Sequence, residues 1–250
     1  MQTKKIIFLA SDCESSRWVY NALIKDFEIT AAIIEQPLSK KVLFKKRVKK
    51  IGYLKVIGQT LFSMLVVPVL KSRAIARKAA LIEQYRLQNA DFNGTKIHRV
   101  PSVNDDATKQ LLEMLAPDIV LVNGTRIISK KILECTPAVF INMHVGITPM
   151  YRGSHGGYWA LYNNDVANFG TTIHMVDKGV DTGAVIKQAF IRPDKGDNFV
   201  TYPILQTAIG IKALKEVLPD VMEGKHEIKK HTEKGMMYYQ PTIWQYLFSK

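Results

Sequence analysis

Residues 6–10 read IIFLA and residues 118–123 read DIVLVN, two short runs in which almost every side chain is apolar. Strands that are apolar on both faces are typical of a parallel sheet covered by helices on both sides. Similar β-rich runs occur at 29–34, 96–100, 139–144, 171–176 and 184–191. Helical periodicity lies between them at 14–25, 104–115, 154–164 and 198–217. This alternation predicts an α/β fold with a doubly wound, mostly parallel sheet.

The positive charge of the chain is concentrated in one segment. The 250 residues carry 35 Lys and Arg against 22 Asp and Glu, a formal net charge of +13. Twelve of the cations fall between Gln36 and Glu83, where there is no acidic residue, and the remaining chain is nearly balanced. A hydrophobic share of 47% otherwise describes a globular chain and excludes a disordered or collagen-like protein.

The basic segment interrupts the regular alternation as an insertion over about 38–87. Apolar residues from Phe44 to Leu61 recur at spacings of three and four, with lysines between them, which predicts an amphipathic helix. The simpler interpretation is a solvated basic face on a helix packed against the domain. The alternative is a peripheral contact of residues 40–78 with an anionic membrane or a phosphorylated substrate. The longest apolar stretch, 61–70, is about half of a bilayer-spanning helix, so no transmembrane span is expected.

We expect one α/β domain over 1–225, with the insertion at 38–87, and a short C-terminal tail over 226–250. The tail is rich in aromatic residues, which suggest docking onto its own domain or onto a partner. The two cysteines, Cys13 and Cys135, are far apart and match neither a disulfide framework nor a zinc site. The N-terminal apolar run is too short for a signal peptide. These features favour a cytoplasmic protein, with a location at the membrane periphery as the variant that the basic segment suggests.

The first polar cluster directly follows the run at 139–144 and reads INMHVGITPMYRGSHGGYW over 141–159. Asn142 and His144 are two residues apart, so on a strand both side chains project from the same face. An amide donates to a developing oxyanion, and an imidazole exchanges protons near neutral pH. The pair suits acyl or formyl transfer, although anchoring of a loop explains the same residues equally well.

A second cluster, GTTIHMVDKGVDTGAVIKQ at 170–188, is expected to form two strands joined by a loop beside the first cluster. Asp181 in this loop has the chemistry to orient and stabilise a nearby imidazole. His174, which alternates with apolar residues on the predicted strand, is interpreted as structural.

The two clusters together resemble the folate-dependent formyltransferases, which act on methionyl-tRNA, glycinamide ribonucleotide or nucleotide-linked amino sugars. The resemblance rests on N-x-H at 142–144, on TPMYRG at 148–153 and on GTTIHMVDKGVDTGAVI at 170–186, and it extends over about 116–188. Several separated polar positions match together, which makes the pattern more specific than a single short motif. The resemblance implies a Rossmann-like formyltransferase fold.

The resemblance also implies the roles of individual residues. Asn142, His144 and Asp181 would be catalytic: Asn142 and protonated His144 would stabilise the oxyanion, and His144 or a water held by Asp181 would move the proton. The formyl donor would be 10-formyltetrahydrofolate, and no metal is required. Two segments would hold its pterin, and their residues are Val122, Asn123, Gly124, Thr125, Asp177, Gly179 and Val180.

Residues at the predicted start of a helix are the candidates for binding the acceptor. Arg152, Ser154 and His155 precede Gly156 there and would hold an anion, although such residues also serve as simple helix caps. Tyr151, next to Arg152 in the retained family motif, is added to this acceptor-binding set.

Departures from the family pattern guide the choice of acceptor. Only 69 residues follow Asp181, so formylation of initiator tRNA is not expected. The first predicted strand is followed by SDCESSRW, which lacks the glycines of a phosphate loop. We therefore expect a small, phosphate-bearing amine, first a nucleotide-linked amino sugar and second glycinamide ribonucleotide. A non-enzymatic RNA- or membrane-binding module is the competing hypothesis, and the oligomeric state, with a homodimer as one option, stays open.

Overall fold

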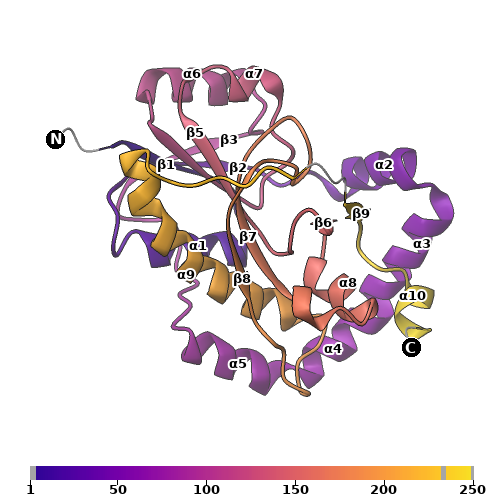
Figure 1. The fold of residues 1–250 in the computed structure, drawn as a ribbon. Coiled ribbons are helices and arrows are strands. Elements are labelled where there is room, and N and C mark those ends of the chain that lie inside the picture. Colours follow the sequence, from indigo (N-terminus) through magenta and orange to yellow (C-terminus); the bar gives the residue numbers. More distant parts are fainter. Residues whose placement is uncertain (1–3, 232–234, 249–250) are drawn as a thin grey trace.

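A seven-stranded sheet in the order β3-β2-β1-β4-β5-β7-β8 forms the centre of the protein, whose computed structural model describes residues 4–231 and 235–248 (Figure 1). Neighbouring strands from β3 to β5 are parallel, and β5–β7 and β7–β8 pair antiparallel. The predicted α/β fold with a mostly parallel sheet is thus confirmed. The strands of this sheet are β1 (Ile6–Ser11), β2 (Ile29–Glu35), β3 (Lys96–Val100), β4 (Ile119–Asn123), β5 (Val139–His144), β7 (Gly170–Met175) and β8 (Val185–Phe190).

Helices occur in every interval where periodicity predicts them. The longest, α9, continues past residue 217 and through Pro219, because Leu218 and Val221 remain buried against the sheet. The helices outside the insertion are α1 (Glu14–Leu23), α6 (Asp106–Leu115), α7 (Lys130–Leu133), α8 (Gly156–Tyr162), the 3₁₀ turn η2 (Val166–Asn168), α9 (Tyr202–Glu223) and α10 (Ile243–Leu247).

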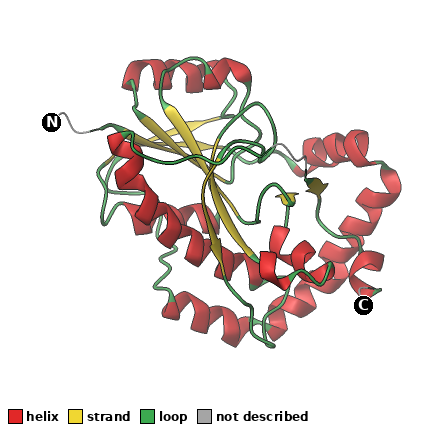
Figure 2. Ribbon diagram, viewed as in Figure 1, coloured by secondary structure: helices red, strands yellow, loops and turns green. Residues whose placement is uncertain are grey.

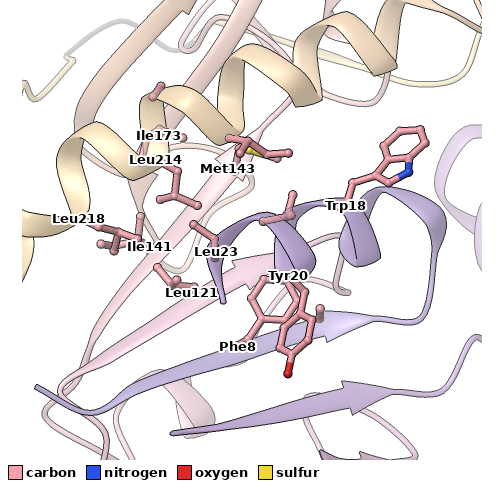
Figure 3. Packing of buried hydrophobic residues seen from close by; sticks show 14 of the residues in the cluster. Phe8, Trp18, Tyr20, Leu23, Leu121, Ile141, Met143, Ile173, Leu214 and Leu218 are labelled. Carbon is pink, nitrogen blue, oxygen red and sulfur yellow. The ribbon is translucent and has the colours of Figure 1, made fainter. Parts of the chain in front are cut away.

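Alternate side chains of the strands fill two separate cores, one on each face of the sheet. Figure 2 shows helices on both sides of the strands. On one face Phe8, Leu121 and Ile141 pack against α1 and α9, as Figure 3 shows. On the other face Ile7, Leu9 and their neighbours pack against α6 and α7. The central strands are therefore apolar on both faces, as their sequence predicts.

The insertion forms an arc of helices along one edge of the molecule (Figure 1). Its helices are α2 (Lys40–Ile51), α3 (Tyr53–Leu61), the π-helical turn η1 (Phe62–Val66), α4 (Val67–Arg73) and α5 (Ile75–Gln84). The single amphipathic helix expected from Phe44 to Leu61 is wrong, because Gly52 with φ of 83° separates α2 from α3. Its packing against the domain holds for α3, where Val56 and Gln59 are buried, but not for α2, none of whose residues is buried.

The apolar part of the insertion is longer than its sequence suggests. Residues Tyr53–Arg73 form a continuous helical run of 21 residues that is long and apolar enough to cross a membrane by length and composition alone. Only 28% of its apolar window is buried inside the protein. The expectation of no such span counted 61–70 alone, because Gln59, Thr60 and Ser63 divide the apolar residues in the sequence.

The C-terminal tail docks on its own domain. Its strand β9 (Met236–Tyr238) pairs parallel with β6 (Tyr151–Gly153) in a small second sheet. Its helix α10 lies against α3 (Figure 1), where the Gln59 amide donates to the Gln240 carbonyl at 2.7 Å. An added Cβ on Gly58 would lie 2.3 Å from the ring of Trp244, so α10 packs where α3 has no side chain. The tail therefore closes over the region in which β5 and β6 carry the polar clusters.

Candidate active site

A cleft of about 420 Å³ opens at the carboxyl ends of β4 and β5, where ligands bind in open α/β sheets. The segments 122–128 and 142–145 line one part of it, and the loop at 176–181 lines another. Tail residues Met237, Tyr238 and Tyr239 complete the wall together with Lys50 from α2. Segments that are far apart in the chain thus meet in one concave site.

Strand β5 separates its polar and apolar side chains between its two faces. Ile141 and Met143 are buried in the core with α9, whereas Asn142 and His144 line the cleft. The antiparallel register places Asn142 directly opposite His174 on β7. The two side chains consequently meet, with 3.1 Å between Asn142 Nδ2 and His174 Nε2.

The carboxylate of Asp181 lies between two imidazole rings. Its Oδ2 is 3.4 Å from His144 Nδ1, and its Oδ1 is 3.6 Å from His174 Nε2. The backbone amide of Gly153 also donates to Oδ2, at 2.9 Å. The structure therefore brings Asn142, His144 and Asp181 together, and it adds His174, whose interpretation as a purely structural residue is corrected by this position.

Backbone carbonyls determine which ring nitrogen of each histidine carries the proton. His144 Nε2 lies 2.8 Å from the carbonyl of Tyr151, so a neutral ring donates there and leaves Nδ1 as the basic nitrogen toward Asp181. His174 Nδ1 lies 2.7 Å from the carbonyl of Met175, which leaves Nε2 to accept from Asn142. The second N–H of the Asn142 amide remains available for a ligand.

The environment shifts the pKa values of the acid and the base in the same direction. Burial lowers the pKa of His144 below its ordinary value of 6.5, although Asp181 and the Tyr151 carbonyl partly oppose this effect. Burial alone would raise the pKa of Asp181, but the interactions with His144, His174 and the Gly153 amide outweigh it and lower this pKa to about 2. At neutral pH the site thus holds a carboxylate beside a neutral imidazole.

Gly146 leaves the room that His144 needs. A Cβ at this position would lie 2.5 Å from the Tyr151 carbonyl and 2.6 Å from His144 Nε2. The loop around it is held by Thr172, whose hydroxyl donates to the Gly146 carbonyl at 2.8 Å and accepts from the Thr148 amide at 3.0 Å. The tight turn after β5 therefore fixes the orientation of the imidazole.

The residues expected to hold a pterin all line the cleft, and they form two facing segments. One is Val122 to Thr125 at the end of β4, and the other is the loop that contains Asp177, Gly179 and Val180. The Asp177 carboxylate accepts from the Gly179 amide and from the Thr182 hydroxyl, which folds this loop. The lining combines exposed backbone with apolar Val122 and Val176, a surface suited to a flat heterocycle.

Of the residues expected to bind the acceptor, only Ser154 lines the cleft. The Tyr151 ring is buried, and its hydroxyl donates to Asp165. The Arg152 guanidinium donates to the backbone carbonyls of Val180 and Gly235, so it joins the loop to the tail. The His155 ring packs on Phe199 at 4.5 Å, and burial lowers its pKa to about 4. None of these three side chains lines the cleft, and their contacts support the fold around it, so their role in acceptor binding stays a prediction.

Sequence reasoning missed several residues of the cleft. Lys50 lines it with Nζ 5.4 Å from the ring centre of Tyr239, and Arg126 lines it from the loop after β4. The position of His174 follows from pairing β5 with β7, a signal present in the sequence once that pairing is assumed. No comparable signal places Lys50, because its contact depends on how the insertion and the tail fold together. Within residues 4–231 and 235–248, no group of three or more His, Cys, Asp or Glu is arranged to hold a metal ion.

Comparison with known sequences finds one family model, described as "Formyl transferase", over residues 5–205. The methionyl-tRNA formyltransferase of Pelobacter propionicus is 24% identical over 97% of this chain and 65% of that protein. That of Anaeromyxobacter dehalogenans is 30% identical over 64% of this chain and 51% of that protein. The chain spans from about half to about two thirds of the length of these curated relatives.

Solved structures share the fold. A glycinamide ribonucleotide transformylase from Symbiobacterium toebii superposes with a TM-score of 0.60 at 17% identity, covering 91% of this chain and 95% of that one. A sugar N-formyltransferase from a Shewanella species reaches a TM-score of 0.58 at 15% identity, covering 94% of this chain and 76% of that one.

Proposed function

This chain belongs to the formyl transferase family, and from this premise we propose that it moves a formyl group from 10-formyltetrahydrofolate to the amine of a nucleotide-linked amino sugar. The observation that carries the proposal is the meeting of Asn142, His144 and Asp181 in one cleft. A non-enzymatic module has no need for such an arrangement.

Enzymes of this family use 10-formyltetrahydrofolate, which supplies an activated formyl group. The cleft of this chain fits a pterin, since two backbone segments, Val122 to Thr125 and Asp177 to Val180, face each other across it. Backbone N–H and C=O groups read the hydrogen-bonding edge of a heterocycle, and the apolar Val122 and Val176 contact its faces.

The geometry supports a separate role for each of the three residues in the transfer step. The free N–H of Asn142 donates to the formyl oxygen as the acceptor amine attacks the formyl carbon. His144 Nδ1, the basic nitrogen, takes the proton that the amine loses, and the Asp181 carboxylate at 3.4 Å stabilises the resulting imidazolium. The bond from the formyl carbon to the folate nitrogen breaks, and that nitrogen receives the proton from His144. The products are a formamide and tetrahydrofolate.

The cleft wall supports an acceptor with a phosphate and a ring system. Lys50 provides a cation for a phosphate oxygen, and Tyr239 provides an aromatic ring on which a base or a sugar ring packs. The names of the relatives leave the acceptor open between tRNA, sugar and ribonucleotide. We favour the nucleotide-linked amino sugar because it combines a primary amine with all of these groups.

The test is incubation of the protein with 10-formyltetrahydrofolate and a panel of acceptors, followed by mass spectrometry for the added formyl group. The panel contains nucleotide-linked amino sugars, glycinamide ribonucleotide and methionyl-tRNA. We expect the sugar nucleotide to be formylated and His144→Ala to abolish the product. Formylation of glycinamide ribonucleotide or of methionyl-tRNA in its place would contradict the proposed acceptor. The absence of a formylated product with every acceptor would contradict the proposed activity.

The role of Lys50 has a matched control in the same helix. Lys50→Ala should raise KM for the sugar nucleotide about tenfold, because a charge-assisted contact to phosphate is lost. Lys49→Ala should leave KM unchanged, since Lys49 is exposed and does not line the cleft. Equal KM values for both variants would remove Lys50 from the acceptor site.

A further inference from the structure

The helical run from α3 through α4 exposes large apolar side chains on its outer side. They are spaced by three and four residues, lie on one face of the helix and are here called the outer face: Leu54, Ile57, Leu61, Met64 and Leu65. Leu54 is 78% exposed, Met64 67% and Leu65 58%. The neighbouring α10 adds Leu247, which is 62% exposed, and Phe248 directly after it is 80% exposed. Large exposed apolar side chains gathered on neighbouring elements mark an interaction site.

The same insertion carries cations that make no ion pair with the protein. Arg77 pairs with Asp194 and Asp197, and Lys78 pairs with Glu14. The other ten form no ion pair within residues 4–231 and 235–248: Lys40, Lys41, Lys45, Lys46, Arg47, Lys49, Lys50, Lys55, Lys71 and Arg73. Seven of them belong to α2, which buries none of its residues. Apart from Lys50, which lines the cleft, these charges therefore face solvent without a counterion from the described chain.

We propose that α2 and the outer face dock the protein on the surface of an anionic membrane. The apolar side chains enter the boundary between headgroups and acyl chains, and the cations contact the lipid phosphates. This combination distinguishes a membrane from the other partners. A nucleic acid uses the cations but not Leu54 and Met64, and an apolar protein surface uses those residues but leaves ten cations unpaired.

The contacts of α3 with the domain indicate that the helix lies in the plane of the membrane. The inner side of the helical run is buried through Val56 of α3, Phe62 of η1 and Leu70 of α4, and Phe62 packs edge-on against Phe199 with ring centres 4.9 Å apart. Gln59 is bonded to Gln240 of the tail. Insertion across a bilayer would break these contacts, whereas docking by the outer face keeps all of them.

The test is co-sedimentation of the full chain with vesicles of phosphatidylcholine, with and without phosphatidylglycerol. We expect binding to the anionic vesicles that weakens as salt is raised, because exposed charges are screened. Each of Lys41→Gln, Lys45→Gln and Lys46→Gln should weaken binding about fivefold. Equal binding to both vesicle types, or binding to neither, would overturn the proposal.

Met64→Asp tests the apolar contribution against a matched control. Met114 on α6 is 64% exposed, close to the 67% of Met64, and Figure 1 shows α6 at the top of the view, away from α3 and α4. Met64→Asp should weaken vesicle binding at least tenfold, and Met114→Asp should leave it unchanged, with both variants retaining the wild-type thermal unfolding curve. Unchanged binding by Met64→Asp would refute docking by the outer face.

Two further measurements identify the competing occupants of this surface. If the protein does not bind vesicles but forms a dimer that Met64→Asp dissociates, the outer face is the contact surface for a second copy of the chain. Resistance of the bound protein to alkaline carbonate extraction would assign it to a spanning helix. Either result overturns docking in the membrane plane, and release by carbonate supports it.

Discussion

The negative charge of Asp181 lies close to two imidazole rings, and this arrangement favours a different role for each polar residue of the site. The carboxylate, with a pKa of about 2, stays ionised at every physiological pH. Burial keeps His144 neutral near pH 7, so its Nδ1 is free to accept a proton. The proton on His144 then lies beside the Asp181 carboxylate, which stabilises the imidazolium, so the buried imidazole can still act as a base.

Replacing this carboxylate should change both the rate and the pH profile of kcat. The neutral form of His144 is lost as the pH falls through its pKa, so the acid limb of the wild type should lie below pH 6.5. Asp181→Asn removes the partner that raises this pKa and should move the limb to still lower pH. Loss of imidazolium stabilisation should also reduce kcat about 10²- to 10³-fold.

The measurement is kcat at saturating acceptor, so that titration of the free substrate amine does not enter. Binding of tetrahydrofolate, followed by quenching of intrinsic fluorescence, shows whether the cleft of the variant is intact. An acid limb at the wild-type pH in Asp181→Asn would contradict the coupling of Asp181 to His144.

At the scale of elements, the antiparallel pair β5–β7 builds the site by register. Asn142 and His174 occupy opposed positions, and the side chains that alternate with them fill the core. The hydrogen bond at 3.1 Å between the two side chains orients the Asn142 amide. We therefore propose that His174 is a positioning residue, which would act on the transferred group through Asn142.

His174→Phe should lower kcat by about 10- to 100-fold while KM for the formyl donor changes little, since the amide loses its orientation but the cleft keeps its shape. His174→Gln, which retains an acceptor for the amide, should recover part of the loss. His98→Phe is the matched control, as His98 lies on β3 outside the cleft. A wild-type kcat in His174→Phe would exclude the positioning role.

At the scale of the whole molecule, the insertion and the tail are joined to each other and to the cleft. Trp244 of α10 packs against Gly58 of α3, and β9 pairs with β6, whose Gly153 amide donates to Asp181. The wall of the cleft that carries Lys50, Tyr238 and Tyr239 depends on this joint. We therefore propose that these segments outside the sheet select the acceptor.

Gly58→Ala should loosen the tail, because its Cβ would lie 2.3 Å from the Trp244 ring. We expect the free energy of unfolding to fall by about 1–3 kcal/mol, the usual cost of overpacking, and the tail to be cleaved faster in limited proteolysis. Gly196→Ala is the control, since an added Cβ there meets nothing within 4 Å. If Gly58→Ala and Gly196→Ala have the same free energy of unfolding and the same rate of cleavage, the contact of Trp244 with Gly58 does not stabilise the tail.

The alternation of strands and helices and the positions of the two polar clusters could be predicted from the sequence alone. These features are local: a run such as 118–123 is apolar on both faces whatever its neighbours are, and the spacing of Asn142 and His144 places them on one face of any strand. The position of the first cluster at the carboxyl end of a strand follows from the same pattern, because a parallel sheet gathers its loops at one edge. The second cluster follows β7, which runs antiparallel to β5, so its meeting with the first cluster depends on that pairing and on the path of the loop after β7.

What each side chain faces depends on the packing of distant segments. This packing buried Tyr151, placed the His155 ring on Phe199, brought His174 and Lys50 to the cleft, and left Leu54 and Met64 exposed on the outer side of α3 and η1. Periodicity tells which residues share a face, but the element that covers that face comes from a distant part of the chain. The contacts and burial of a side chain depend on the element that covers it. Its role therefore depends on how the insertion, the tail and the sheet pack together.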